Sequence, residues 1–494
     1  MYIGMNYVNG DFVPTRPDFS DIDPCTGESL GMFPESDESE VKEAVAAASS
    51  AFKTWRQVSR PLRAEYFDRL CDAVKARHDE LVQAISQETG KTLNESHAEV
   101  IEALHMAQYC FGKGREPCGQ IIASEIADKD AYAIRKPKGV VGVVAPWNFP
   151  FAIGGFWCAA PAILEGNTVV LKPSEDSPWL GQLTAQLYDD AGFPPGVFNL
   201  VHGFGDTGAD LAEHPDVKHI CFTGSAAVGQ SIRRVCAESW DKTCSCEMGS
   251  KSACIIFDDA DWDLAVSAAV ASAYKLSGQR CVSSGRLIVQ RGIYEKFSET
   301  FAEASRHVRT GSPFSDGEVA YGPIINESQR DRVESFNEMV NADPDATVLL
   351  KGHRAGNGKG YFLTPHVYQV EWKTHHHRVE YDYLKTEVFG PHVALIPFDT
   401  IEDAIRIYND TEYGLAMGVV TSDFKKARRI RDECDYGLGY WNSGSIAAES
   451  HLPFGGVKKS GNGQPSAAGT FHAVTHEVAW TVNHGGLAFP QGMK

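Results

Sequence analysis

Apolar residues recur at helical spacing through the first quarter of the chain. Ala, Leu and Val alternate with charged residues over 41–56 and 60–89, and the same pattern continues over 94–112. Apolar positions three and four residues apart form one apolar stripe along a helix. Two short alternating runs follow, 119–124 and 131–139, and predict a hairpin that projects from this helical body.

From residue 140 the pattern changes to buried strands that alternate with helices. Four largely apolar runs, in VVGVVAP, NTVVLKP, VFNLVHG and VKHICFTG, are followed by helical stretches over 151–164, 177–190, 206–213 and 226–239. Strands with little polar alternation are buried on both faces, as in a parallel sheet covered by helices. Right-handed crossovers make this a doubly wound, Rossmann-like α/β domain, whose ligands lie beyond the carboxyl ends of the strands.

A second α/β region begins near Met248. Further strands are predicted in SACIIFDDAD, GRLIV, VALIPF and GVVTS, and no linker rich in Pro, Gly or Ser precedes them. We therefore expect a broad interface between two lobes, with the functional site between them. The last segment, 472–485, alternates like a strand with an exposed edge. Together with the hairpin at 119–138 it is expected to pair across subunits.

The charge balance excludes some classes of partner. The chain has 46 basic and 65 acidic residues and a formal net charge of −19. We therefore expect neither nucleic acid nor a membrane surface as a partner. The stretch MYIGMNYVNGDFVP has no basic segment with an apolar one behind it, and no apolar run is long enough to span a bilayer. The expected location is cytoplasmic.

Cysteine and histidine usage predicts no metal site. Twelve cysteines in 494 residues are too sparse for a disulfide framework, and none forms the CxxC pair of structural zinc sites. Cys244 and Cys246 are interpreted as packed strand residues rather than a redox pair. The run His375–His377 is internal, and adjacent side chains on an extended chain point to opposite faces.

Two strand ends carry residues suited to a dinucleotide. Gly224 and Gly229 bracket the start of a helix, where backbone N–H groups can hold a phosphate, although they could instead only allow close packing. A P-loop requires Lys after the second glycine, and Gln230 stands there. At another strand end, Lys172 can meet a ribose or phosphate, and Glu175 can bind ribose hydroxyls and repel a 2′-phosphate. The expected cofactor is NAD, with NADP as the alternative.

One cysteine lies in a setting suited to catalysis. Cys281, in SGQRCVSSG, is surrounded by small residues, and a nucleophilic thiol needs a depressed pKa or a nearby base. No histidine adjoins it in sequence, but a partly desolvated Glu247, in CEMGSKS, can activate water or the thiol. Asn148, in PWNFP, can donate to a tetrahedral oxyanion.

These motifs carry a family resemblance. PWNFP, LKPSE, FTGSAAVG, CEMGSKS, GQRC, EVFGP and LPFGG occur in the order and approximate spacing of the aldehyde dehydrogenase superfamily, over nearly the whole chain. The resemblance implies that Cys281 adds to an aldehyde to give a thiohemiacetal, and that loss of hydride to nicotinamide leaves a thioester. It implies that Glu247 activates the water that hydrolyses this thioester. Asn148 and the Cys281 N–H would form the oxyanion hole.

The resemblance also implies the cofactor site and the domains. Its cofactor-binding positions are Trp147, Lys172, Ser174, Glu175, Gly224, Ser225, Gly249, Glu387 and Phe389. The implied fold has a dinucleotide-binding domain (1–117 and 139–247), a catalytic domain (248–450) and bridging segments (118–138 and 466–494). Members of the family assemble through such bridging segments, so a homodimer or homotetramer is expected.

Some positions depart from the family pattern. Ser250 replaces a glycine of the base motif, and Trp157 stands where many members carry a lysine. The run AIGG resembles members that act on semialdehydes with an amino or carboxyl group. Hydroxyls of the loop NSGSIAAESHLPFGG, from Ser443, Ser445 and Ser450, could grip a substrate carboxylate. Glu449 in that loop would repel one.

Three alternatives remain open from sequence. An acylating dehydrogenase would pass the thioester to coenzyme A, but such relatives generally lack the glutamate found at Glu247. A thiol hydrolase or esterase would use Cys281 without a dinucleotide. A non-catalytic paralogue would keep only the fold, although the thiol, base and asparagine are all retained.

Overall fold

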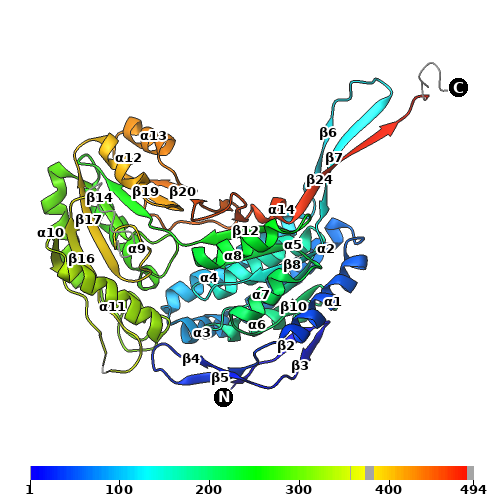
Figure 1. Cartoon of the computed structure of the whole chain (residues 1–494), viewed down its shortest axis with the longest axis horizontal. Coiled ribbons are helices and arrows are strands. Elements are labelled where there is room, and N and C mark those ends of the chain that lie inside the picture. The colour runs from blue at the N-terminus through cyan, green and yellow to red at the C-terminus, as the bar shows by residue number, and fades with distance from the viewer. Residues whose placement is uncertain (1, 357, 373–382, 487–494) are drawn as a thin grey trace.

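Two mainly parallel sheets, each packed against helices, form two lobes (Figure 1). The computed structural model describes residues 2–356, 358–372 and 383–486. The strands of the first lobe follow the order β12-β11-β8-β9-β10-β2-β3. Five of them run parallel, and their bounds are β8 (Val140–Val144), β9 (Thr168–Lys172), β10 (Phe198–Leu200), β11 (Val217–Gly224) and β12 (Thr243–Met248). The doubly wound fold predicted from the sequence is therefore confirmed.

The chain reverses its direction of travel across this sheet between β8 and β11. Strands β8, β9 and β10 are laid down in one direction, and β11 then joins the opposite side of β8. Ligands of open α/β sheets bind beyond the carboxyl ends of the strands at such a switch point. The loops that follow Val144 and Gly224 therefore lie where a ligand is expected.

The helices of the first lobe match the predicted pattern with two differences. Their bounds are α1 (Glu38–Trp55), α2 (Arg60–Ala76), α3 (His78–Thr89), α4 (Leu93–Lys113), α5 (Ala160–Leu164), α6 (Pro178–Asp190), α7 (Gly205–Glu213) and α8 (Ala226–Ala237). The stretch 60–89 is two helices, because Arg77 leaves helical geometry at φ −108° and ψ 15°. The stretch 151–164 begins as a π-helix, η1 (Pro150–Ala159), before α5.

The N-terminal strands were not indicated by the sequence. β2 (Asn6–Val8) and β3 (Asp11–Val13) extend the first sheet antiparallel, and β1 (Tyr2–Ile3), β5 (Ser29–Phe33) and β4 (Phe19–Ile22) form a separate small sheet. Each of these strands has two to five residues. Such short runs show too few alternations for periodicity to mark them.

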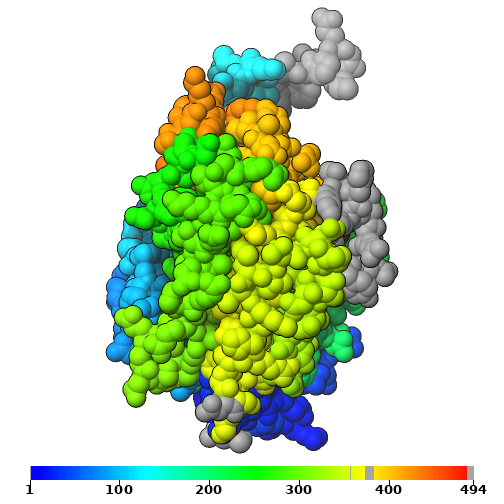
Figure 2. All heavy atoms as spheres, turned by 90° about the vertical axis from the view of Figure 1, so that its left-hand side faces the viewer, coloured from blue at the N-terminus to red at the C-terminus, as the bar shows by residue number. Residues whose placement is uncertain are grey.

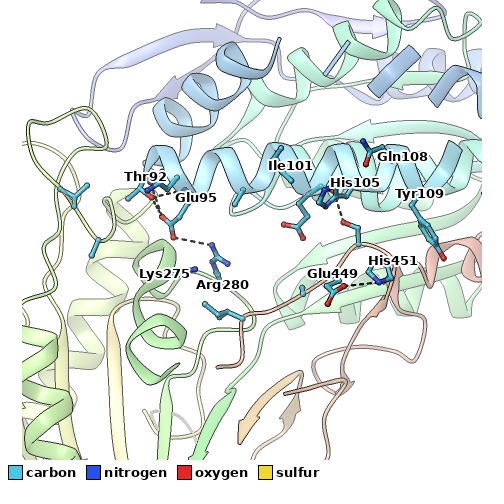
Figure 3. Close-up of a pocket in the computed structure, with 18 residues that line it drawn as sticks. Thr92, Glu95, Ile101, His105, Gln108, Tyr109, Lys275, Arg280, Glu449 and His451 are labelled. Atoms are coloured by element: carbon cyan, nitrogen blue, oxygen red, sulfur yellow. Dashed lines mark hydrogen bonds and ion pairs between the residues drawn. The ribbon is translucent and has the colours of Figure 1, made fainter. Parts of the chain in front are cut away.

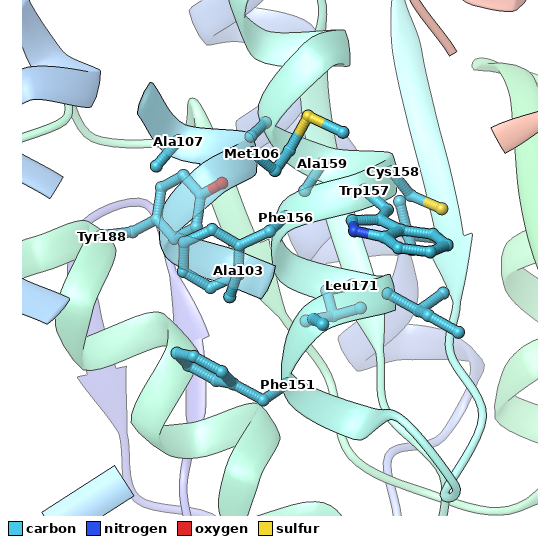
Figure 4. Close-up of a cluster of buried hydrophobic side chains, with 14 of the residues drawn as sticks. Ala103, Met106, Ala107, Phe151, Phe156, Trp157, Cys158, Ala159, Leu171 and Tyr188 are labelled. Atoms are coloured by element: carbon cyan, nitrogen blue, oxygen red, sulfur yellow. The ribbon is translucent and has the colours of Figure 1, made fainter. Parts of the chain in front are cut away.

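The interior of the first lobe is packed between α4, η1 and α6 (Figure 4). Ala103, Met106 and Ala107 of α4 face the aromatic side chains of η1, where the rings of Phe151 and Phe156 lie 4.9 Å apart. A fully buried side chain of this size contributes about 1.5–3 kcal/mol. Helix α4 is thus a rigid support for the loop that precedes η1.

The second lobe has its own doubly wound sheet, in the order β15-β16-β17-β14-β13-β19-β20. Its strands are β13 (Ala253–Ile256), β14 (Arg286–Gln290), β15 (Ala346–Leu350), β16 (His366–Val370), β17 (His392–Phe398), β19 (Ala416–Val420) and β20 (Leu438–Trp441), of which only β15 is antiparallel to its neighbour. Its helices are α9 (Trp262–Tyr274), α10 (Tyr294–Arg306), α11 (Glu327–Ala342), α12 (Ile401–Asn409) and α13 (Phe424–Glu433). Figure 2 shows this lobe, green to orange, covering most of one side of the molecule.

A third sheet forms an arm that projects from the first lobe (Figure 1). It pairs the predicted hairpin, β6 (Gly119–Ile122) and β7 (Lys129–Pro137), with the C-terminal strand β24 (Thr475–Asn483). The hairpin and the C-terminal strand are therefore both confirmed. Ile121 and Trp480 on this arm are 84% and 61% exposed.

The remaining elements are short. They are η2 (Lys275–Gly278), η3 (Arg291–Ile293), α14 (Thr470–Ala473), the pair β18 (Tyr413–Gly414) with β22 (Val457–Lys458), and the pair β21 (Pro453–Phe454) with β23 (Ser466–Ala467). Within the described ranges, no helix combines the length and the apolar character needed to cross a bilayer.

Candidate active site

A cavity of about 530 Å³ lies between the two lobes at the switch point of the first sheet. All twelve residues predicted for catalysis or cofactor binding line it. They come from six places: the loop after β8, the ends of β9, β11 and β12, the loop after η2, and the loop before β17. Positions up to about 240 residues apart in sequence are therefore brought together, as expected for strand ends that share one sheet edge.

Cys281 is placed in this cavity by a strained loop. Leu276 and Ser277 of η2 have φ values of 52° and 56°, a left-handed conformation that side chains rarely adopt. Of the twelve cysteines, ten are buried, Cys118 is exposed on the surface, and Cys281 is partly exposed. Burial, together with the nearby carboxyls of Glu387 and Glu247, raises the pKa of the Cys281 thiol to about 12. The thiol is therefore protonated at rest, and attack requires a base.

Asn148 lies next to the nucleophile's loop. Its side chain is buried, and its Nδ2 donates a hydrogen bond to the Gln279 carbonyl at 2.9 Å. Gln279 is two residues before Cys281, so this hydrogen bond holds the side-chain amide of Asn148 against the loop that carries the thiol. The Nδ2 group carries two hydrogens. The second remains for an oxyanion formed on a substrate carbon attached to the sulfur.

Glu247 ends β12 and is almost fully buried. Burial raises the pKa of its carboxyl well above the usual value, and the Gly456 N–H only partly opposes this. Its Oε2 has no hydrogen-bond partner among the described residues. A Cβ added at Gly455 would lie 2.7 Å from Oε1, so the glycines of LPFGG make room for this carboxyl. A high-pKa carboxylate beside the thiol suits a general base.

The ends of β9 and β11 form the cofactor edge. Lys172 is buried and lies 3.2 Å from Glu175, whose side chain is 40% exposed. Ser174 lies between them in the same turn. Gly224 ends β11, and Ser225 caps α8 by accepting from the Val228 N–H at 3.3 Å. A capped helix start directed at a cavity favours a phosphate, and the nearby cation and carboxylate suit the ribose and phosphate groups.

The second lobe closes the other end of the cavity. Glu387 accepts a hydrogen bond from the Ser250 N–H at 2.7 Å, and burial raises the pKa of Glu387 to about 7. A Cβ at Gly249 would lie 2.0 Å from Glu387 Oε2, so a side chain there would displace this carboxyl. Phe389, at φ 62°, meets the Trp147 ring edge-to-face at 5.5 Å.

These residues fit a dinucleotide. The cavity volume lies within the range of about 300–1,000 Å³ that is typical of ligand pockets. One end offers a helix start and a cation, and the other offers a buried carboxyl and two aromatic rings beside the thiol. The two ends suit a pyrophosphate with its adenosine and a nicotinamide with its ribose, respectively.

Some residues of this cavity were not found from the sequence. Arg332 and Gln329 on α11 line it, and they donate hydrogen bonds to the carbonyls of Glu387 (2.8 Å) and Phe389 (3.0 Å). Phe454 lies beside Glu247. An exposed amphipathic helix such as α11 carries no sequence signal that distinguishes two site residues from ordinary surface residues.

A second hollow, of about 1120 Å³, is lined by the residue that precedes Cys281, Arg280 (Figure 3). Arg280 lines this hollow, whereas Cys281 lines the cofactor cavity. Helix α4 forms one wall, and residues 446 and 448–451 form another. The two neighbouring residues Arg280 and Cys281 therefore line different hollows.

Charged groups of both signs line this second hollow. Arg280 lies 3.6 Å from Glu95 and 5.0 Å from the centre of the Phe149 ring (Figure 3). Glu102 also lines it, and burial, reinforced by Glu99, raises the pKa of Glu102 to about 7. Lys275 lies at its exposed rim. None of these roles was indicated by the sequence, because the direction of a side chain on a loop or helix is not visible there.

The serine loop contributes less than expected. Ser450 reaches the hollow but donates its hydroxyl hydrogen bond to the Glu102 carbonyl at 3.1 Å. Ser445 is buried and donates to the Val282 carbonyl. Ser443 does not line the hollow. Glu449 does, but it is paired with His451 at 3.3 Å. The run His375–His377 lies outside the described residues.

Comparison with known proteins agrees with this geometry. The sequence profile described as "Aldehyde dehydrogenase family" matches residues 12–479. The chain is 35% identical to an alpha-ketoglutaric semialdehyde dehydrogenase of Bacillus subtilis, over 92% of this chain and 93% of that protein. It is 36% identical to a mitochondrial succinate-semialdehyde dehydrogenase of Arabidopsis thaliana, over 89% and 81%.

A solved structure is similar over nearly the whole chain. A betaine aldehyde dehydrogenase point mutant from Staphylococcus aureus, crystallised with NAD+, has a TM-score of 0.92 and 29% identity, and the match covers 99% of each chain. The superposition extends over both lobes and the arm, so the architecture described above is shared in full.

Proposed function

The chain belongs to the aldehyde dehydrogenase family and is an NAD(P)-dependent oxidoreductase that converts aldehydes to carboxylic acids, and from this premise we propose that its aldehyde carries a carboxylate. The observation that carries this proposal is the state of Arg280. Its side chain is 13% exposed and lines the hollow behind Cys281. Its Nε is buried without a hydrogen-bond partner among the described residues.

A buried guanidinium with an unused donor favours an anionic ligand. Arginine presents five N–H donors in a planar fork that matches a carboxylate. Glu95 meets only one arm of Arg280, at 3.6 Å, beyond normal hydrogen-bond length. A substrate carboxylate would satisfy the remaining donors. The semialdehydes in the names of the Bacillus and Arabidopsis relatives also carry a carboxylate.

We propose the following roles for the residues around the aldehyde. Glu247 takes the proton of the Cys281 thiol, directly or through water, and the sulfur adds to the carbonyl carbon. Asn148 Nδ2 and the Cys281 N–H donate to the oxyanion that forms. When bound, the nicotinamide supplies the hydride acceptor that converts the adduct into a thioester. Glu247 then takes a proton from water, which attacks the thioester and releases the acid and the thiol.

The cofactor residues are proposed on the same basis. Lys172, Ser174 and Glu175 hold the adenosine ribose, and Gly224 and Ser225 hold the pyrophosphate at the start of α8. Trp147, Gly249, Glu387 and Phe389 surround the nicotinamide end. Glu175 favours NAD over NADP because a carboxylate repels a 2′-phosphate.

Substrate preference tests the proposal. The ratio of kcat/KM for a four-carbon carboxylate semialdehyde to that for butanal should exceed about 100 in the wild type. Arg280→Met should lower this ratio by about 10–100-fold, because a charge-assisted pair is lost, while kcat/KM for butanal changes by less than about 3-fold. An equal loss for both aldehydes, or an unchanged ratio, would show that Arg280 does not bind the carboxylate.

We also propose that the arm assembles the protein into a homodimer or homotetramer. Ile121 and Trp480 expose apolar surface on the arm, and its outer strands β6 and β24 each have one unpaired edge within the described residues. Edge strands with apolar side chains pair readily with other chains. Light scattering should give a dimer or tetramer mass, and the double variant Ile121→Glu, Trp480→Glu should give a smaller species.

The domain division and the compartment remain proposals. Strands β8 to β12 share one sheet, β13 to β17, β19 and β20 another, and β6, β7 and β24 a third. This supports a dinucleotide-binding domain of 1–117 and 139–247, a catalytic domain of 248–450 and bridging segments of 118–138 and 466–494. None of the twelve cysteines, all of them described, forms a disulfide. This supports a reducing, cytoplasmic location.

A further inference from the structure

Helix α4 presents two buried carboxylates that contact two different loops of the active site. Glu95 and Glu99 lie one turn apart on the same face of the helix, and both are less than one-tenth exposed. Glu99 contacts the loop that carries Asn148, and Glu95 contacts the loop that carries Cys281. The first loop belongs to the first lobe, and the second loop leads into the second lobe.

Glu99 holds the start of η1. Its Oε1 accepts hydrogen bonds from the N–H groups of Phe151 and Ala152, at 3.0 and 3.1 Å. These are the unsatisfied donors of the first helical turn, just beyond Asn148. Its Oε2 accepts from Lys91, which is also fully buried. The Lys91 ammonium lies 3.9 Å from the centre of the Phe149 ring. The residues that this ion pair contacts, Phe149, Phe151 and Ala152, therefore all lie within four positions of Asn148 in sequence.

Glu95 holds the strained part of the nucleophile's loop. Its Oε1 accepts a hydrogen bond from the Leu276 N–H at 2.7 Å. Leu276 and Ser277 have φ values of 52° and 56°. A left-handed residue other than glycine persists only where its surroundings hold it. Glu95 also contacts Arg280, the residue before Cys281.

We propose that Glu99, with Lys91, and Glu95 are positioning residues that fix the oxyanion donor Asn148 beside the sulfur of Cys281. This inference rests on the function proposed above for those two residues. Glu99 lines neither hollow, and Glu95 lines the hollow of Arg280 but not the cofactor cavity, so the contacts of both with the catalytic residues run through the loops that they hold. Helix α4 can serve as the reference frame because the same face, continued by Ala103 and Met106, is packed against η1 (Figure 4).

The energetics favour a geometric role for the ion pair. A buried pair gains little net stability, because the desolvation of both charges offsets their attraction. A misplacement of about 1 Å in a reacting group can lower a rate about 100-fold, and loss of one oxyanion donor costs about 10²–10³-fold. We therefore expect loss of the ion pair to change the rate of a reaction that forms an oxyanion more than it changes the free energy of unfolding.

Two reactions of Cys281 that need no cofactor separate the roles. Acylation by p-nitrophenyl acetate forms an S–C bond, places negative charge on the carbonyl oxygen, and expels p-nitrophenolate. Alkylation by iodoacetamide forms an S–C bond and expels iodide with no oxyanion. The background variant is Cys118→Ser, which removes the other exposed thiol. Peptide mapping confirms modification at Cys281.

The double variant Lys91→Met, Glu99→Leu removes both charges and the acceptor. It should lower the acylation rate about 10–100-fold while alkylation stays within about 2-fold. Lys91→Met, Glu99→Gln restores an acceptor oxygen for Phe151 and Ala152 and should recover most of the rate. The control Lys113→Met, Glu116→Gln removes an exposed pair from the last turn of α4 and the segment after it, and should change neither reaction.

Two results would overturn the assignment. They are an equal fall in acylation and alkylation in the folded Leu variant, and acylation that stays within about 2-fold of the background. The variant Asn148→Ala tests separately the proposed function on which this inference rests. If it leaves the ratio of acylation to alkylation unchanged, Asn148 is not the oxyanion donor and the proposed mechanism fails first.

Glu95→Ala provides a test that does not depend on the folding of the double variant. It releases the strained loop, so both reactions should slow at least about 10-fold relative to Glu40→Ala. Glu95 also completes a capping box with Thr92 at the start of α4. Glu40 completes the same kind of capping box on α1 and lines neither hollow. Rates within about 2-fold of this control would reject a role for Glu95 in positioning Cys281.

Discussion

The two hollows lined by the neighbouring residues Arg280 and Cys281 are built in different ways. The cofactor cavity, about 530 Å³, is formed mainly by residues at the carboxyl ends of parallel strands. The hollow behind Arg280, about 1120 Å³, is formed by one face of α4 and by loop residues. Strand ends converge whenever the sheet forms, whereas the second hollow depends on which side chains a helix and its neighbouring loops present.

This difference assigns separate tasks to the two sides. The cofactor side is set by sheet topology, and we propose that it serves any aldehyde. We propose that the charges of the Arg280 side distinguish one aldehyde from another. Substitutions should accordingly divide into those that abolish the reaction at the junction, those that change cofactor preference, and those that change aldehyde preference.

The largest effect on activity is expected from substitution of Cys281. Cys281→Ala removes the only thiol among the described residues that line the cofactor cavity. NADH formation should fall at least about 10⁴-fold, because no covalent adduct can form. Isothermal titration should show NAD+ affinity within about 2-fold of wild type. Residual dehydrogenase activity above about 1% would assign the chemistry to another group.

Replacement of the base should separate the two halves of the reaction. Glu247→Gln should slow thioester hydrolysis about 10²–10⁴-fold, because water loses its proton acceptor. Stopped-flow measurement should still show a burst of about one NADH per active site. The burst itself should be slower than in the wild type, because Glu247 also takes the thiol proton, but it should be slowed less than thioester hydrolysis. Equal slowing of the burst and of the steady state would contradict the assignment of hydrolysis to Glu247.

The pH dependence of kcat, compared between the wild type and Glu247→Gln, provides a further test. Burial raises the pKa of Glu247, so its basic form appears only as the pH rises through that elevated value. The steady-state kcat of the wild type should therefore increase with pH. This rise should be absent in Glu247→Gln, whose side chain does not titrate. A rise that persists in the variant would come from another group.

A smaller effect is expected at the far end of the cofactor side. Glu175→Ala should raise kcat/KM for NADP relative to NAD about 10-fold, because a carboxylate next to the 2′-phosphate is removed. The KM for the aldehyde should not change. Glu213→Gln, an exposed carboxylate at the end of α7, serves as the matched control. An equal change in both variants would assign the effect to overall charge.

The smallest effect is expected on the aldehyde side. Burial raises the pKa of Glu102 to about 7, so its charge is lost as the pH falls through that value. Repulsion of a carboxylate substrate then decreases, and its KM relative to that of butanal should fall about 2–5-fold between pH 8 and 6. Glu102→Gln should give a flat ratio. A ratio that still titrates in this variant would exclude Glu102.

The sequence predicts some parts of the fold better than others, and the difference again depends on whether a part belongs to a regular sheet and its helices. The helix-after-strand pattern from residue 140 onward was read correctly, because buried parallel strands and amphipathic helices have strong periodicities. The N-terminal strands were missed because runs of two to five residues are too short for a period. The break at Arg77 and the π-helical start of η1 depend on local backbone geometry, which composition does not reveal.

The candidate site shows the same contrast. Asn148, Lys172, Gly224 and Glu247 were found because each lies at or just beyond a strand end. The unused Nε donor of Arg280 could not be predicted. It depends on the distance from Arg280 to Glu95, which lies 185 positions earlier on another element. Polar residues on a helix face have no sequence signal until their contacts are known.

The most direct test is mass spectrometry of the trapped acyl-enzyme. Glu247→Gln is mixed with NAD+ and a four-carbon carboxylate semialdehyde, quenched in acid within one turnover, and digested. We predict one acyl group for each NADH formed in the burst, carried on the peptide that contains Cys281. Stoichiometric NADH with no acyl group on that peptide, or an acyl group on any of the other eleven cysteines instead, would contradict the central claim.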